Sequence, residues 1–190
     1  MKIKISLNKK NIDEALKKVK KLENQINVMV AEFYKACYNY FVNKANYYLS
    51  IADIGQVTKG EIQNSWHFVK TTSGAKFINT AQRAVFVEFG VGIVGERNKH
   101  PNADNTFYLY NVESASKQAY DYTGAWSFET SKDELDIPTN AIDYSLPTDD
   151  GGIWVRTYGT NGVWYAFKAL EDLKLAYKEL WKQIKIKYLG

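Results

Sequence analysis

The chain contains few of the residues that form disulfides or bind transition metals, and it lacks a long apolar run. Its 190 residues include one cysteine, two histidines, three prolines and no run of 18 apolar residues. Cys37 therefore cannot form an internal disulfide bond, and the sequence offers no zinc-ligand spacing. We expect no membrane span, and the first residues lack the apolar region of a signal peptide. No metal or cofactor is expected.

Aromatic residues are abundant instead, with 14 Tyr, 9 Phe and 5 Trp. The length is enough for one domain, residues 1–190, with a substantial core. Cys37 lies among aromatic and small apolar residues, where a free cysteine usually packs as a small hydrophobe. Surplus aromatics also suit interfaces between subunits.

The net charge of +4 hides two basic ends and an acidic middle. Residues 1–24 hold eight lysines against three acids, and residues 168–190 hold six against three. Residues 100–152 hold ten acids against two lysines, a net charge of −8. Such asymmetry bears on association rather than on fold.

Residues 12–54 carry apolar side chains every three or four positions, which predicts one long helix. A capping box at Asn11 favours its start and Gly55 its stop. A helix of about 40 residues would be about 60 Å long, so we expect a kink or a protruding arm. The lysine pairs along it are typical of a solvated helix face, although nucleic-acid binding is the alternative.

The pattern then changes to the alternation typical of strands. Strands are expected within residues 3–7, 65–71, 75–80, 83–89, 106–111, 125–130 and 153–158, with a loop at 159–162 and a last amphipathic helix from Phe167 to Tyr188. This order predicts an α+β fold: a long N-terminal helical region, a mainly antiparallel sheet, an aromatic and acidic insertion at about 100–152, and a C-terminal helix.

Gly90, Gly92 and Gly95 match the spacing of a dinucleotide-binding fingerprint after a predicted strand. That motif must open a helix, whereas Asn98 and Pro101 are expected to stop any helix early. We therefore interpret the glycines as a tight corner or bulge with positive φ.

Glu88 is an acid inside an otherwise apolar predicted strand, where alternation places it on the face of Phe86. As a lone carboxylate it lacks the partner of an acid–base pair. We expect an edge or interface residue, or a partner for Lys or Arg, rather than a catalytic base. Neither histidine lies in a nucleophile signature, and the acids at 149–150 are typical of a turn.

One segment, FINTAQRAVFVEFGVG at residues 77–92, resembles neck proteins of long-tailed DNA bacteriophages. The likeness continues through residues 93–95 and His100-Pro101. It includes Thr58, Gly60, Ile62 and Ser65 upstream, WVRTYG at 154–159 and Phe167-Lys168-Ala169 downstream. Together these pieces cover roughly residues 10–185.

The resemblance implies a non-enzymatic virion protein of the tail or neck, assembled in the host bacterial cytoplasm. It implies a homo-oligomeric ring, typically a hexamer, that completes the tail and joins it to the head. Its partners would be other neck, tail-tube or head-connector proteins, with viral DNA passing through the lumen without specific binding. A tail terminator ring is the close alternative, and a nucleic-acid binder using the N-terminal lysines is an alternative from another class.

Candidate subunit-interface or structural-corner residues are Glu88, Phe89, Gly90, Gly92, Gly95, Asp133, Glu134 and Asp136. We expect the acidic block to face a neighbouring ring, a basic helix or the DNA channel. A third hypothesis, an enzyme with Glu88 as general base, predicts that Glu88→Gln abolishes activity while the fold is retained.

Overall fold

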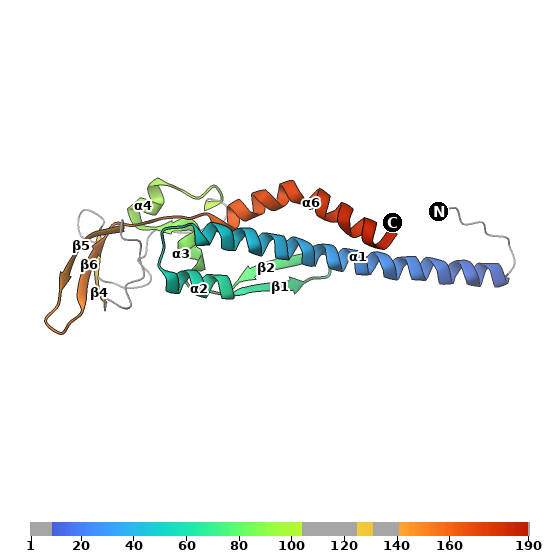
Figure 1. Ribbon diagram of the computed structural model, residues 1–190, viewed down its shortest axis with the longest axis horizontal. Coiled ribbons are helices and arrows are strands. Elements are labelled where there is room, and N and C mark those ends of the chain that lie inside the picture. The colour runs from blue at the N-terminus through green and yellow to red at the C-terminus, as the bar shows by residue number, and fades with distance from the viewer. Residues whose placement is uncertain (1–8, 104–124, 131–140, 190) are drawn as a thin grey trace.

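Two long antiparallel helices form the axis of the molecule in the computed structural model, which describes residues 9–103, 125–130 and 141–189 (Figure 1). Helix α1 spans Lys9–Ser50, and α6 spans Tyr165–Leu189. Lys187 contacts Glu32 near the C-terminal end of α6, whereas Asp172 contacts Tyr48 near its start. The predicted α+β architecture is confirmed.

The α1–α6 pair buries the stripe that predicted the long helix. Cys37, Phe41, Ala45 and Leu49 are buried on α1, and Tyr165, Ala169 and Leu173 are buried on α6. Ala45 and Ala169 are fully buried, and small side chains at such positions let two helix axes approach closely. The expected packing role of Cys37 is confirmed.

Helix α1 is one continuous element whose first half extends past the end of α6 (Figure 1). We call residues 9–28 the arm. Met29 is 2% exposed, whereas Leu16 is 61% and Val19 49% exposed. The expected protruding arm is therefore confirmed. The expected stop at Gly55 was wrong, because α1 ends at Ser50 and Gly55 instead caps the start of α2, Gln56–Asn64.

A hairpin covers one side of α1. Strand β1, Trp66–Lys70, pairs antiparallel with β2, Ala75–Asn79, and both were predicted. Their aromatic side chains meet α1, where Phe41 packs edge-on against Trp66 at 5.2 Å between ring centroids. Phe77 packs edge-on against Tyr38 and at a tilt against Phe41, so the hairpin extends the core.

The glycine segment differs from the prediction. Residues expected as a strand form helix α3, Ala84–Phe89, followed by β3, Gly90–Val91, and a short helix α4, Gly92–Arg97. Ala84 and Glu88 are buried one turn apart, so a helical face rather than an alternating one points inward. The β-branched residues suit a strand, but tertiary packing overrides that preference. Glu88 therefore does not share a strand face with Phe86.

Helix α4 contains Gly92 and Gly95 and ends at Arg97, just before Asn98, so the expected early stop is confirmed. The expected loop at 159–162 was wrong. Residues expected as a loop include strand β7, Gly159–Asn161, which pairs antiparallel with β3.

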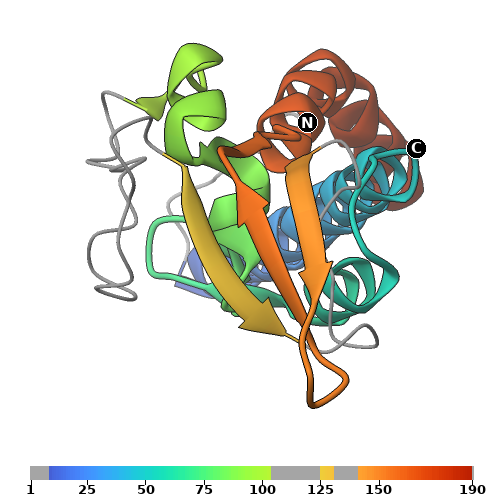
Figure 2. The same ribbon diagram turned by 90° about the vertical axis from the view of Figure 1, so that its left-hand side faces the viewer.

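A three-stranded sheet lies at the end of the molecule opposite the arm (Figures 1 and 2). Strands β4, Trp126–Thr130, and β5, Ile142–Pro147, flank β6, Ile153–Thr157, in the antiparallel order β4-β6-β5. We call β5 and β6 with their connecting turn, residues 141–158, the distal hairpin. Strands β4 and β6 were predicted, whereas β5 was not. The strands expected within 3–7 and 106–111 lie outside the described residues.

Candidate functional site

The side chain of Glu88 holds the start of α6 onto the glycine corner. Its Oε2 accepts a hydrogen bond from the backbone N–H of Ala166 at 2.8 Å, and Oε1 accepts one from Phe167 at 2.8 Å. These are among the first N–H groups of α6, which have no partner within their own helix. A carboxylate there also meets the positive end of the helix dipole. Glu88 thus caps a helix that begins 77 residues later in the sequence.

His100 completes the environment of this carboxylate. Its Nε2 lies 2.9 Å from Glu88 Oε1, and its Nδ1 accepts the N–H of Asn102 at 3.0 Å. A nitrogen that accepts carries no proton, so this pattern assigns the neutral ring protonated on Nε2, which donates to Glu88. The ring packs against Phe89 at 4.3 Å and Phe167 at 5.3 Å between centroids.

Backbone contacts fix the same joint. The backbone N–H of Val163 donates to the carbonyl of Val87 at 2.8 Å, and the backbone N–H of Trp164 donates to the carbonyl of Glu88 at 3.2 Å. Trp164 has a φ of 57°, which is rare for a residue that is not glycine. Its indole Nε1 is buried without a hydrogen-bond partner among the described residues. The chain therefore turns into α6 through a strained residue held from both sides.

Glycine is required where β3 meets β7. A Cβ on Gly90, whose φ is 81°, would lie 2.5 Å from the carbonyl oxygen of Thr160. A Cβ on Gly159, whose φ is 106°, would lie 2.0 Å from the carbonyl oxygen of Val91. At both positions φ is positive and an added Cβ would clash with backbone atoms of the paired strand, which fits the expected tight corner. Gly92 also has positive φ, whereas Gly95 is buried within α4 without it, so the expectation of positive φ was wrong for Gly95.

This arrangement suits a structural joint more than a catalytic one. Glu88 is 7% exposed, and its two oxygens already accept from three donors. A general base needs a lone pair within reach of a substrate proton. The expected partner of Glu88 was Lys or Arg, but the structure pairs it with a histidine and a helix start.

Sequence reasoning missed this connection because the partners are far apart in the chain. In the sequence, His100 precedes Pro101 and lies in no nucleophile signature. The signal that could have linked them was chemical: Glu88 is a lone acid in an apolar run, and His100 is one of only two histidines in the chain. Asp133, Glu134 and Asp136 lie outside the described residues.

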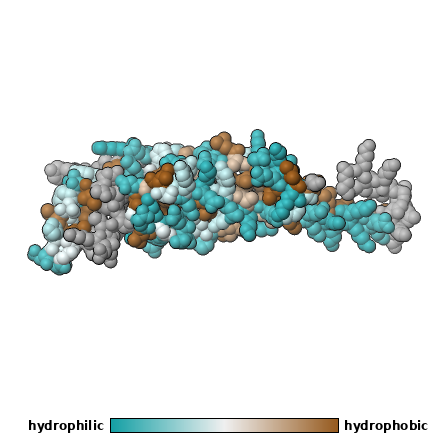
Figure 3. Space-filling view, viewed as in Figure 1, coloured by the Kyte–Doolittle hydropathy of each residue, from teal (hydrophilic) through white to brown (hydrophobic). Residues whose placement is uncertain are grey.

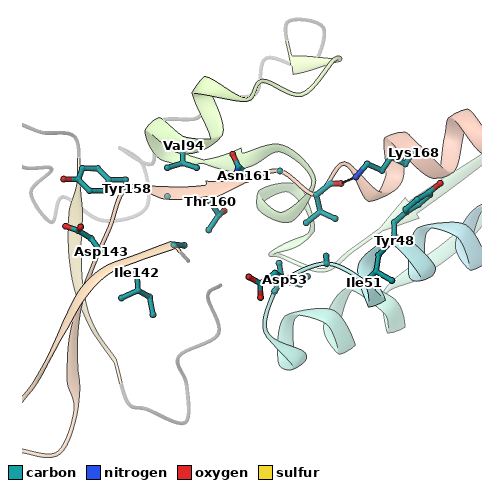
Figure 4. Close-up of a pocket in the computed structure, with 16 residues that line it drawn as sticks. Tyr48, Ile51, Asp53, Val94, Ile142, Asp143, Tyr158, Thr160, Asn161 and Lys168 are labelled. Atoms are coloured by element: carbon teal, nitrogen blue, oxygen red, sulfur yellow. Dashed lines mark hydrogen bonds between the residues drawn. The ribbon is translucent and has the colours of Figure 1, made fainter. Parts of the chain in front are cut away.

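A surface cavity of about 590 Å³ lies between the C-terminal end of α1, the start of β5 and strand β7 (Figure 4). Its charged groups are largely engaged with neighbours. Lys168 donates to the carbonyl of Val163 at 2.7 Å, and Asp143 pairs with Arg156. The polar groups on its wall do not converge on a common point in Figure 4. The cavity therefore marks a junction between two parts of the fold.

Two exposed apolar surfaces lie at opposite ends of the molecule. On the arm, Ile12, Leu16 and Val19 are 38–61% exposed. On the distal hairpin, Tyr144, Leu146 and Trp154 are 41–57% exposed. The alternation of Ile142, Tyr144 and Leu146 could have predicted β5. The side of the arm visible in Figure 3 is largely hydrophilic, as expected for an amphipathic helix.

The described residues show neither a cluster of metal ligands nor a helix that is apolar over a membrane-spanning length. In that part of the chain, no three His, Cys, Asp or Glu residues gather as metal ligands. None of the described helices is both long enough and apolar enough to cross a bilayer.

Comparisons with family models, with curated proteins and with solved structures found no match.

Proposed function

We propose that the protein is a structural virion protein of a tailed bacteriophage, which forms a ring at the neck, completes the tail and joins it to the head. The observation that carries this proposal is the arm. An amphipathic helix that leaves its apolar stripe outside its own subunit's core needs another surface to cover that stripe. Assembly into a larger particle supplies such a surface.

The resemblance to neck proteins supports the proposal independently of the arm. Residues 77–92, which carry that resemblance, form β2, α3 and the glycine corner. In this chain they position α6 through Glu88. The residues that carry the resemblance thus connect α3 to α6 within the subunit, and such a connection suits a family with a structural role. A tail terminator ring at the same neck is the close alternative.

Nucleic-acid binding is the second candidate, because Lys17, Lys18, Lys20 and Lys21 are all exposed on the arm. A binder that works through lysines loses affinity steeply as salt rises. Titration of a DNA duplex at about 50 mM salt tests this alternative. We expect no binding there, and tight binding lost on Lys→Gln substitution at these four positions would favour it over the neck proposal.

The decisive experiment locates the protein in particles. The mass of the purified protein in solution is measured first. Antibody or density labelling of the protein then shows its position in images of virions from the phage that encodes it. We expect an oligomer in solution and label at the junction of head and tail. A monomer that is absent from virions contradicts the proposal.

A further inference from the structure

The two exposed apolar surfaces match each other in size. Ile12, Leu16 and Val19 follow the i, i+4, i+7 spacing of one helix face and span about 10 Å. On the distal hairpin, Leu146 is the register partner of Trp154, and Tyr144 that of Arg156. Register partners project to the same side of a sheet, and two residues along a strand are about 7 Å apart. A single helix face can therefore cover this patch.

The outward face of the distal hairpin is distinct from its packed face. Ile153, Val155 and Thr157 of β6 are at most 7% exposed, whereas Trp154 between them is 41% exposed. Arg156 on the outward face lies over the rings of Tyr144 and Tyr158 and pairs with Asp143. Arg156 thus orders the ring of Tyr144 on this outward face.

The two surfaces are also complementary in charge. At 100° per residue, Lys20 lies about 40° beyond Leu16, at one edge of the apolar stripe of the arm. The arm carries six lysines against three acids, a net charge of +3. The distal hairpin carries Asp143, Asp149 and Asp150 against Arg156, a net charge of −2. These three acids lie within the acidic block of residues 100–152.

We propose that the arm of one molecule docks, through Ile12, Leu16 and Val19, on the outward face of the distal hairpin of a second copy of this chain. The two surfaces lie at opposite ends of one elongated molecule, so they cannot meet within it (Figure 1). A contact between two different patches of identical subunits is head-to-tail, and it closes into a ring when the rotation permits. The contact deepens the proposed function, on which its role in a virion rests.

Complementation between two variants tests this contact. The arm variant carries Leu16→Gln and Val19→Gln, which keep helix-forming residues at exposed positions. The distal-hairpin variant carries Leu146→Thr and Trp154→Thr, which suit a strand. Leu175→Gln is the matched control, because Leu175 is 85% exposed on α6 and belongs to neither surface. Circular dichroism confirms that each variant is folded.

Sedimentation at about 100 µM protein and low salt reads out the assembly. The wild type and Leu175→Gln should sediment above the 21.8 kDa of one chain, and each double variant should self-associate at least about tenfold more weakly. A mixture of the two double variants should form a complex of one copy of each, because each retains one intact surface. Raising the salt should weaken this complex.

Three outcomes overturn the inference. The first is a wild type that is monomeric under these conditions. The second is a distal-hairpin variant that still assembles while the arm variant joins no complex, which means that arms pair with arms. The third is a mixture of the two double variants that forms no complex. Labelling of virions tests the proposed function separately. Label at the neck without complementation contradicts only the proposed contact. Complementation without label at the neck contradicts only the proposed neck role.

Discussion

Glu88 and His100 face each other in the interior, with Oε1 and Nε2 2.9 Å apart and both side chains under 10% exposed. The pair connects three segments, because Glu88 belongs to α3, His100 follows α4, and the carboxylate caps α6. A buried carboxylate is stable only when its oxygens are satisfied. The joint between corner and helix therefore depends on this contact.

Glu88→Ala should destabilise the protein by about 2–4 kcal/mol. The change removes the cap of α6 and leaves a buried imidazole N–H without its acceptor. Urea unfolding followed by circular dichroism measures the free energy of unfolding. Glu96→Ala on the exposed face of α4 is the control and should change that free energy by less than about 0.5 kcal/mol. Equal effects of the two substitutions would contradict the assigned role.

The two side chains should also be energetically coupled. His100→Phe keeps a ring against Phe89 but removes the donor to Glu88 and the acceptor for Asn102, at a cost of about 1–3 kcal/mol. In a double-mutant cycle with Glu88→Ala, the combined loss should fall short of the sum by about 1 kcal/mol or more. Additive losses would mean that the two groups act independently.

Gly90→Ala and Gly159→Ala should each cost more than about 2 kcal/mol, since a methyl group would meet backbone atoms at 2.5 and 2.0 Å in a strained conformation. Gly60 supplies the contrast, because it lies within α2 with nothing within 4 Å of an added Cβ. Gly60→Ala should stabilise the protein by about 0.4–1 kcal/mol. Thermal unfolding of the three variants gives the comparison, and a neutral Gly159→Ala would contradict the required approach of β3 and β7.

Periodicity along the sequence predicted the parts of the fold that local pattern determines. The stripe of α1, the hairpin of β1 and β2, and helix α6 all repeat over several turns or alternations. The prediction for α3 was wrong because six residues contain too few turns to show a helical period. The β-branched residues of this segment also suit a strand.

The site was less predictable than the fold, for a physical reason. The glycine corner was foreseen from Gly90 and Gly92, whose backbone freedom is a local property. The capping role of Glu88 is not local, because its acceptor groups meet donors 12 to 79 residues away in sequence. Only the folded chain brings those donors together.

Acid should loosen the contact between α1 and the end of α6. Hydrogen bonds from Lys187 and Tyr188 lower the pKa of Glu32 below its ordinary value of 4.5. A lowered pKa in the folded state contributes stability above pH 4.5, and that contribution is lost as the pH falls through the lowered value. Hydrogen exchange in the last turns of α6, corrected for intrinsic rates between about pH 6 and pH 3, should show protection falling with acid.

Two variants separate this contact from other acid effects on α6. Glu32→Gln should remove most of the pH dependence of exchange in that segment. Glu179→Gln, whose carboxylate pairs with Lys182 within α6 itself, should leave it in place. Exchange that responds to pH identically in both variants would contradict a role for Glu32.

Charge reversal in the acidic block should impair assembly. Asp133, Glu134 and Asp136 contribute three of the ten acids in residues 100–152, so replacing them with lysine changes the charge of that block from −8 to −2. If the block faces a basic helix, the substituted block loses most of its attraction to that helix. Salt, which screens the same attraction, should weaken assembly of the wild type as well. Lys117→Gln and Lys132→Gln form the matched control, because they make the block more negative. Sedimentation of the purified protein and infectivity of phage carrying the substitutions are the measurements, and assembly that is unchanged in both would contradict an interface role for these acids.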